Sequence, residues 1–408
     1  MDNRYKFISI ILLLYFFLSF YTLPAQVIDQ KQDNKFQISG YFQAQTEIGQ
    51  LYANTYTGKT TLYDPKSDKN DFFIRYGIRR GRVKLTYKEL FAKAVFQMDL
   101  TENGVALKDA YIQLDDTFFK IFALKIGVFD RPFGYEISYS SAKRETPERS
   151  MIFQKLFPDE RDLGASLNIS APEGSFLTGL KLEAGLFSGN GIRKDDNSKL
   201  DFIGHLKYDK KKSGISYGIG ISLYKGTTNN ADSILNKIQN SAWTTYTGIP
   251  NTLNNREYIG FDGQVSITTL IGVTQIRAEY LFGQQPSLSN NFLSPKSNSY
   301  DTTNTFNYIR NFIGGYIYFI QDIDLIPVQL VYKYSYLDPN TKLKGNEIYN
   351  ITDLYLHAHT LGGIWHINPN LCILFCYEIF KNETSQNIQD YQNDRKDNLC
   401  TVRLQYKF

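Results

Sequence analysis

The sequence from Asn398 to Phe408, NLCTVRLQYKF, alternates between apolar and polar residues up to the last residue of the chain. Every second residue is apolar, namely Cys400, Val402, Leu404, Tyr406 and Phe408. Because successive side chains of a β-strand point to opposite faces, one face of this stretch can meet lipid while the other meets a polar interior. The stretch therefore predicts a membrane-spanning β-strand that ends on an aromatic residue, as strands at the end of bacterial outer-membrane barrels do.

The N-terminus has the pattern of a segment that directs export. Arg4 and Lys6 precede a nearly continuous apolar run from Phe7 to Phe20, and Ala25 then offers a small residue for signal peptidase. This order is typical of a cleaved signal peptide. We expect residues 1–25 to be the signal peptide and residues 26–408 to be the mature domain. The alternative is an uncleaved anchor helix, although the apolar run is shorter than the roughly 20 residues that span a bilayer.

The composition is compatible with a membrane protein built from strands. No later stretch is long and apolar enough for a membrane helix, and the mean hydropathy is −0.34. A transmembrane barrel has a mean hydropathy similar to that of a soluble protein, because half of each strand faces water. The aromatic content of 15% fits aromatic girdles, but it also fits a secreted β-sandwich. A formal net charge of +4 is too small to indicate a nucleic-acid partner, and three cysteines are too few for a disulfide framework.

Sixteen segments have strand character, and most have a length that suits tilted strands crossing a membrane. They are Phe36–Ile48, Phe72–Tyr87, Phe91–Leu100, Leu107–Leu114, Ile121–Phe129, Arg161–Ser170, Leu177–Phe187, Phe202–Tyr208, Ile215–Tyr224, Tyr258–Ile267, Val273–Phe282, Tyr308–Phe319, Pro327–Tyr336, Thr352–Trp365, Leu371–Phe380 and Asn398–Phe408.

The connections between these segments alternate between short and long. Turns such as Lys88–Leu90 and His366–Asn370 are tight, whereas Asp130–Glu160, Lys225–Glu257 and Gly283–Asn307 are long. A soluble sandwich has no reason to sort its connections in this way. The pattern predicts an all-β fold, a 16-stranded antiparallel transmembrane β-barrel with short periplasmic turns and long extracellular loops. The last strand should close the barrel against Phe36–Ile48.

Two of the predicted strands depart from the alternation. Tyr308–Phe319 and Leu371–Phe380 are apolar on both faces. Either a loop packs against their inner side, or their outer side contacts another subunit. The sequence leaves both explanations open.

The segment from Lys125 to Leu167 carries specific motifs. It contains Gly127 at a strand end, the turn Pro132-Phe133-Gly134, the run Glu148-Arg149-Ser150 and the strand start Arg161-Asp162-Leu163-Gly164. In these motifs the chain resembles the family of the phosphate-selective porins O and P. The resemblance also covers the arginine-rich stretch Arg79–Lys88. It implies a sixteen-stranded barrel that assembles as a homotrimer.

The resemblance further implies that the third long loop, residues 130–160, folds inward and narrows the lumen. Its five basic and six acidic residues nearly balance, and charges at a constriction decide which ions pass. The alternative is an extracellular loop with solvated charges. The candidate constriction residues are Arg131, Lys143, Arg144, Glu145, Glu148, Arg149 and Lys155.

Basic residues outnumber acidic ones among the polar positions of the strands. The acidic positions expected in the lumen are Asp99, Asp109, Glu183 and Glu279. The basic positions expected to line the pore are Arg80, Arg82, Lys84, Lys93, Lys207, Arg277, Lys333 and Arg403, with Lys181 and Lys407 on the same side. Such an excess attracts anions. Alternatively, each arginine pairs with a neighbouring carboxylate and only stiffens the wall.

These observations predict an outer-membrane porin for passive diffusion of small hydrophilic solutes, with a preference for anions or phosphate. The alternatives are a substrate-specific oligosaccharide channel, a barrel enzyme or a surface adhesin. No catalytic arrangement or cofactor site is legible, and His357 and His359 are expected to be ordinary lumen residues. The expected partners are outer-membrane lipid, the solutes and the barrel-assembly machinery. Leu404, Tyr406 and Phe408 would be the assembly signal.

Overall fold

The computed structural model of the chain describes residues 35–57, 72–193, 195, 197–230, 233–247, 252–294 and 307–408. The predicted signal peptide, residues 1–25, lies outside the described residues. The barrel belongs to the compact unit Phe36–Phe408. None of the helices in the described residues is long and apolar enough to cross a membrane.

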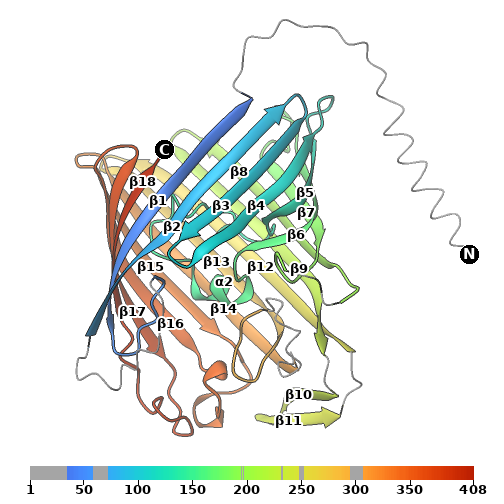
Figure 1. Cartoon of the computed structure of the whole chain (residues 1–408), viewed down its shortest axis with the longest axis vertical. Helices are drawn as coiled ribbons and strands as arrows, with labels where there is room; N and C mark the ends of the chain where they lie inside the picture. Colours follow the sequence, from blue (N-terminus) through green and yellow to red (C-terminus); the bar gives the residue numbers. More distant parts are fainter. Residues whose placement is uncertain are drawn as a thin grey trace, which may run out of the picture. The chain divides into compact units, whose positions relative to one another are not determined.

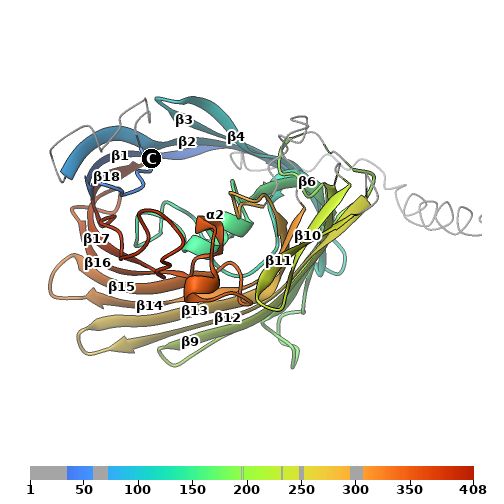
Figure 2. The ribbon, with the colours of Figure 1, turned by 90° about the horizontal axis from the view of Figure 1, so that it is seen from below.

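Sixteen strands close into one antiparallel barrel (Figures 1 and 2), which confirms the predicted fold and strand number. The barrel strands are β1 (Phe36–Gln50), β2 (Phe72–Glu89), β3 (Ala92–Thr101), β4 (Gly104–Asp115), β5 (Phe122–Asp130), β6 (Arg161–Ser170), β7 (Leu180–Phe187), β8 (Asp201–Lys212), β9 (Ile215–Asn230), β12 (Thr252–Thr269), β13 (Gly272–Ser287), β14 (Tyr308–Ile323), β15 (Val328–Asp338), β16 (Leu356–His366), β17 (Leu371–Asn382) and β18 (Leu399–Lys407).

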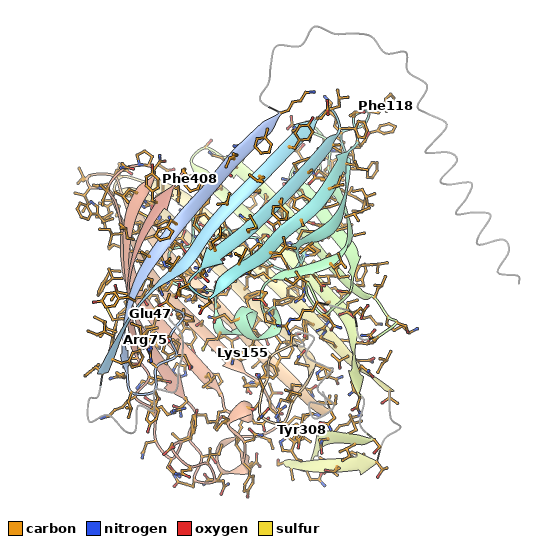
Figure 3. All side chains as sticks on the ribbon, in the orientation of Figure 1. Glu47, Arg75, Phe118, Lys155, Tyr308 and Phe408 are labelled. Atoms are coloured by element: carbon orange, nitrogen blue, oxygen red, sulfur yellow. The ribbon has the colours of Figure 1, made fainter. Side chains whose placement is uncertain are left out.

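The two ends of the chain close the barrel. Strand β18 pairs with β1 from Tyr41↔Lys407 to Gly49↔Leu399, as the sequence predicts. Gly40 and Phe408 exchange two backbone hydrogen bonds, each of 3.0 Å. A Cβ atom on Gly40 would lie 2.5 Å from the ring of Phe408, so glycine at this position lets the terminal ring lie across β1. Figure 3 shows Phe408 at this end of the barrel.

The alternation of side chains separates the two faces of the wall. In β18, Thr401, Arg403 and Gln405 are buried, whereas Leu404 and Tyr406 are exposed on the outer face. An outward row of apolar side chains and an inward row of polar ones is the pattern of a barrel in a membrane. The inner face of the wall is therefore polar at most positions. Where its polar side chains are buried, other parts of the protein fill the interior and cover them.

The prediction that Lys225–Glu257 is a loop is wrong in part. Strand β9 continues to Asn230 and β12 begins at Thr252, and between them β10 (Ile234–Gln239) and β11 (Ala242–Thr247) form a hairpin. Polar residues of β9 and β12 keep the ladder of backbone hydrogen bonds beyond the apolar band. No alternation is needed there, because both faces of these strand ends can be polar.

Two predictions around β16 are also wrong. Thr352 does not begin the strand, because Ile351–Asp353 forms the 3-10 helix η2, in which the Asn350 side chain accepts from the Thr352 amide at 3.0 Å. A second 3-10 helix, η1, covers Gly345–Glu347. His357 and His359 point to the outer face beside Tyr334, and not into the lumen. The inward positions of β16 are occupied by residues such as Ala358 and Thr360, so polarity alone misassigns the face.

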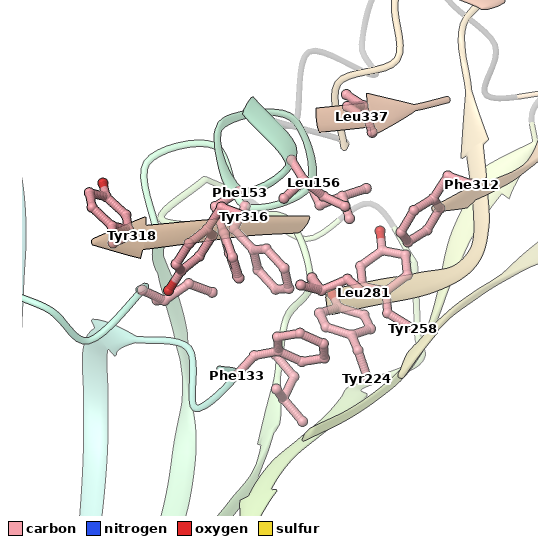
Figure 4. Packing of buried hydrophobic residues seen from close by; sticks show 14 of the residues in the cluster. Phe133, Phe153, Leu156, Tyr224, Tyr258, Leu281, Phe312, Tyr316, Tyr318 and Leu337 are labelled. Atoms are coloured by element: carbon pink, nitrogen blue, oxygen red, sulfur yellow. The ribbon is translucent and has the colours of Figure 1, made fainter. Parts of the chain in front are cut away.

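The loop between β5 and β6 packs against the inner wall around the short helix α2 (Met151–Leu156). Figure 2 shows α2 inside the ring of strands, and Figure 4 shows the apolar cluster that Phe153 forms with Tyr316. The two rings are 6.2 Å apart. Cys376 of β17 likewise lies below the loop, with its sulfur 3.9 Å from the carbonyl oxygen of Glu145. The loop therefore explains why β14 and β17 are apolar on both faces.

Candidate functional site

The first anchor of the loop lies on the wall formed by β9 and β13. The carboxylate of Glu279 accepts the amide N–H groups of Tyr135 at 2.9 Å and of Glu136 at 2.6 Å. Ser222 accepts the amide N–H of Gly134 at 2.8 Å. Gly134 has a φ of +65°, and a Cβ atom there would collide with the pinned carboxylate of Glu279. The Pro-Phe-Gly turn thus needs glycine for both its conformation and its close approach.

A second set of anchors lies on β1, β14 and β15. The hydroxyl groups of Ser141 and Tyr41 are 2.5 Å apart, and those of Thr146 and Tyr318 are 2.7 Å apart. Lys333 donates to the hydroxyl of Thr146 at 3.3 Å. Because these partners project inward from several different strands, the loop crosses the barrel interior and stays fixed against it.

Glu148 sits at the centre of an arginine cluster. Arg79 donates to both of its carboxylate oxygens, at 2.6 and 2.8 Å, Arg80 donates at 2.7 Å and Arg403 at 3.4 Å. Burial disfavours the charged carboxylate, but the nearby guanidinium groups of Arg79, Arg80 and Arg403 outweigh it and hold the pKa of Glu148 well below its ordinary value. Glu148 is therefore a permanent negative charge that neutralises part of the arginine-rich wall.

Two β-bulges add basic side chains to this region. The register between β1 and β2 shifts so that Arg79 has no partner of its own, and the register between β3 and β4 shifts at Lys108. A bulge re-aims a side chain relative to the alternation. Both residues line the interior next to Arg80 and Arg82. Neither residue was predicted to line the pore, because nothing in the residue pattern signals a bulge.

A cavity of about 220 Å³ lies between the loop and the wall of β2, β3 and β4. Of the five basic residues that line it, Lys108 alone has no ion pair with a described residue, whereas Arg82 pairs with Asp99 at 3.2 Å. The charged lining residues are Arg79, Arg80, Arg82, Lys108 and Arg149 with Asp99, Glu148, Asp159 and Glu160. The lining thus carries one more basic than acidic residue.

The other predicted lumen charges are distributed along the wall. Several are paired, as Arg277 is with Glu145, Asp109 with Arg161 at 3.0 Å, Glu183 with Lys125 at 2.9 Å and Lys207 with Asp209 at 3.2 Å. Lys84, Lys93, Lys181 and Lys407 have no ion pair with any residue that the structure describes. Among the predicted pore-lining residues, the arginines therefore form ion pairs with carboxylates more often than the lysines do.

The predicted residues of the loop have different surroundings. Arg131 pairs with Asp162 at 2.9 Å, and Arg149 pairs with Glu160. Lys143 is exposed, and burial lowers the pKa of Lys155 on α2. Arg144 is buried, and its guanidinium nitrogens find no acceptor among the described residues. The cavity brings together only Glu148 and Arg149 of this set.

The family model of the phosphate-selective porins O and P matches residues 53–265 and 327–408. The chain belongs to this family. The porin is a bacterial outer-membrane protein, and it forms a channel for small solutes. Its family and its closed barrel indicate a channel and not an enzyme. Among curated protein sequences, none matches the porin.

Solved structures with the same fold extend over nearly the whole porin. It is similar to OprB of Pseudomonas putida (TM-score 0.59, 9% identity, 92% of this chain and 94% of the other). It is also similar to the anion-selective porin of Comamonas acidovorans (0.54, 11%, 91% and 99%) and to OmpF of Salmonella typhi (0.53, 12%, 91% and 97%). At such low identity these likenesses establish the fold alone.

Proposed function

We propose that the porin passes small hydrophilic solutes by passive diffusion with a mild preference for anions. The cavity between loop 130–160 and strands β2–β4 is the constriction in this proposal. The supporting observation is the charge of its lining, five basic against four acidic residues. Fixed charges act strongly on ions in a narrow passage with low-dielectric walls. A small surplus of positive charge therefore favours anions without excluding cations.

The same lining argues against tight selection of phosphate. Glu148 accepts from the guanidinium groups of Arg79 and Arg80, and Asp99 accepts from Nε of Arg82. These guanidinium groups are the ones a passing phosphate would need, since bidentate donors recognise phosphate best. The ammonium group of Lys108 attracts anions as a point charge but offers less geometric discrimination.

A planar-bilayer measurement tests this function. With a KCl gradient across the bilayer, the reversal potential of the open channel should have the sign of a modest anion preference. Added phosphate should reduce the chloride current only weakly. A channel that stays closed contradicts passive diffusion, and a strong block by micromolar phosphate contradicts the weak selection of anions.

We also propose that Leu404, Tyr406 and Phe408 form the signal that the barrel-assembly machinery binds. They lie on the outer face of the closing strand and are exposed, with 58% of Phe408 accessible. Their accessibility supports recognition from outside the barrel. The homotrimer that the family resemblance implies stays a prediction, which the mass of the detergent-solubilised protein can test.

A further inference from the structure

The short turns of the barrel carry large apolar side chains at their tips. Among the described residues, seven hairpin turns lie at the end of the barrel where the connections are short, which is the expected periplasmic end, and six of them display an exposed Leu, Ile or Phe. Phe118, Phe176 and Leu325 are 83%, 93% and 92% exposed, and Figure 3 shows Phe118 projecting at the rim. The set is named the apolar collar: Leu90, Phe118, Phe119, Phe176, Leu177, Leu270, Ile271, Leu325, Ile326 and Ile367.

The backbone of these turns is built to hold the apolar side chains outward. Leu90 adopts a φ of +48°, a left-handed conformation in which Gly, Asn or Asp is the usual residue. Asp116 accepts the amide N–H of Phe118 at 2.9 Å and that of Phe119 at 3.1 Å. The two rings then meet edge to face at 4.6 Å. A polar turn would form more easily, so the apolar residues point to a contact beyond the turn.

The arrangement of the collar identifies the kind of partner. The tips belong to the turns β2–β3, β4–β5, β6–β7, β12–β13, β14–β15 and β16–β17, which follow one another around the circumference of the barrel. A docked protein would cover one sector of the rim. A lipid leaflet surrounds the barrel on all sides, and this matches a collar that reappears in nearly every turn.

The collar also continues the apolar outer surface of the strands. Trp365 and Ile267 are exposed on the outer face just before the tips Ile367 and Leu270, and Phe122 follows the tip at Phe119. The seventh turn, β8–β9, has no such residue, and the end of β8 next to it carries three exposed lysines, Lys210, Lys211 and Lys212. Basic side chains at a membrane surface attract anionic lipid head groups, so the exception fits the same surroundings.

We propose that the apolar collar inserts into the periplasmic leaflet of the outer membrane, at the boundary between acyl chains and head groups of glycerophospholipids. Lys210–Lys212 contact the lipid phosphates from the end of β8, beside the one turn without an apolar tip. The porin is thereby held at a fixed depth by its turns as well as by its strands. An exposed apolar surface of this extent on a soluble rim would otherwise favour aggregation.

Tryptophan fluorescence tests this contact in the full porin. Trp243 and Trp365 are replaced by Phe, and single tryptophans are then placed by Phe176→Trp, by Leu325→Trp and, as the matched control at the basic end of β8, by Lys211→Trp. Each variant is reconstituted into vesicles of phosphatidylcholine and phosphatidylglycerol, with the acyl chains either plain or brominated near the head group.

The collar proposal predicts that bromolipid removes at least half of the fluorescence at positions 176 and 325. Aqueous acrylamide should quench these two positions several-fold less than position 211. If acrylamide quenches all three positions alike and bromolipid leaves positions 176 and 325 unchanged, the collar lies in water and the proposal is overturned. Because the vesicles contain no second protein, that outcome would instead favour a periplasmic protein as the partner of the collar.

Discussion

Arg79 holds both carboxylate oxygens of Glu148, from Nε to Oε1 at 2.6 Å and from Nη2 to Oε2 at 2.8 Å. Such a bidentate pair is the geometry that arginine also offers to a free carboxylate or phosphate. Glu148 therefore occupies, from within the chain, a position that an anion in transit would otherwise take. This contact links the loop to the wall and lowers the positive charge of the constriction at the same time.

Glu148→Gln should make the channel more selective for anions. The substitution removes one negative charge among Arg79, Arg80 and Arg403, so the anion-to-cation permeability ratio should rise by a factor on the order of ten at low salt. Reversal potentials in a KCl gradient measure this ratio. The variant should also lose about 3 kcal/mol of stability, because buried charges lose their partner.

Lys211→Gln is the control for this experiment, since Lys211 is an exposed charge at the end of β8. It should leave the permeability ratio unchanged. An unchanged ratio in the folded Glu148→Gln channel would show that the arginine cluster does not face the ion path.

The pKa of Glu148 predicts how selectivity depends on pH. A carboxyl with a depressed pKa stabilises the fold fully above its ordinary pKa of 4.5, and the stabilisation is lost as the pH falls through the depressed value. Contributions from Glu148 should therefore be constant between pH 7 and pH 5. The difference in reversal potential between the native channel and Glu148→Gln should persist as the pH falls through 4.5, and it should shrink only at the lower pH at which Glu148 binds its proton. A difference that already shrinks between pH 7 and pH 5 would contradict a depressed pKa.

Gly134→Ala should loosen the loop. The added methyl group meets the Glu279 carboxylate and needs a strained backbone, so the amides of Tyr135 and Glu136 lose their acceptor. Single-channel recordings should show a larger and noisier conductance. Gly174→Ala is the matched control, because Gly174 also has a positive φ, of +80°, but an open surrounding. Equal conductance in both variants would mean that the anchor at Gly134 does not shape the passage.

Deleting Phe408 should impair assembly before it alters conduction. Its backbone bonds to Gly40 at the closing seam and its ring is exposed, whereas Arg80 and Arg403 of the arginine cluster are buried on the inner face. The amount of folded porin in the outer membrane should fall severalfold, while the channels that do assemble keep their unit conductance. Heat-modified mobility on gels measures the folded fraction. Normal insertion of the truncated chain would argue against the assembly role.

Much of the barrel could be predicted from the sequence, because a wall between lipid and a polar interior imposes alternation. The closing pair of Phe36–Ile48 with Asn398–Phe408 follows directly from that constraint, and the structure confirms it. The alternation is lost where a segment does not separate lipid from a polar interior. The hairpin β10–β11 lies in a predicted loop, and the inner face of β16 carries small buried residues such as Ala358.

The constriction was less accessible to prediction than the wall. Arg80 and Glu148 could be named from charge and position, but their contact joins residues 68 positions apart in the chain. Arg79 and Lys108 enter the interior through bulges, which depend on the register between two strands and not on either sequence alone. The balance of charge around the cavity could therefore be determined only once the pairing of the strands and side chains in three dimensions was known.

The reversal potential of Lys108→Gln, compared with that of the native porin in the same KCl gradient, tests whether the charge of the cavity lining sets the anion preference. Lys108 carries the one unpaired positive charge of the cavity lining among the described residues. We expect a small anion preference in the native channel and a reversal potential near zero, or slightly cation-selective, in Lys108→Gln. A native channel that prefers cations, or a substitution that leaves the anion preference intact, would contradict it.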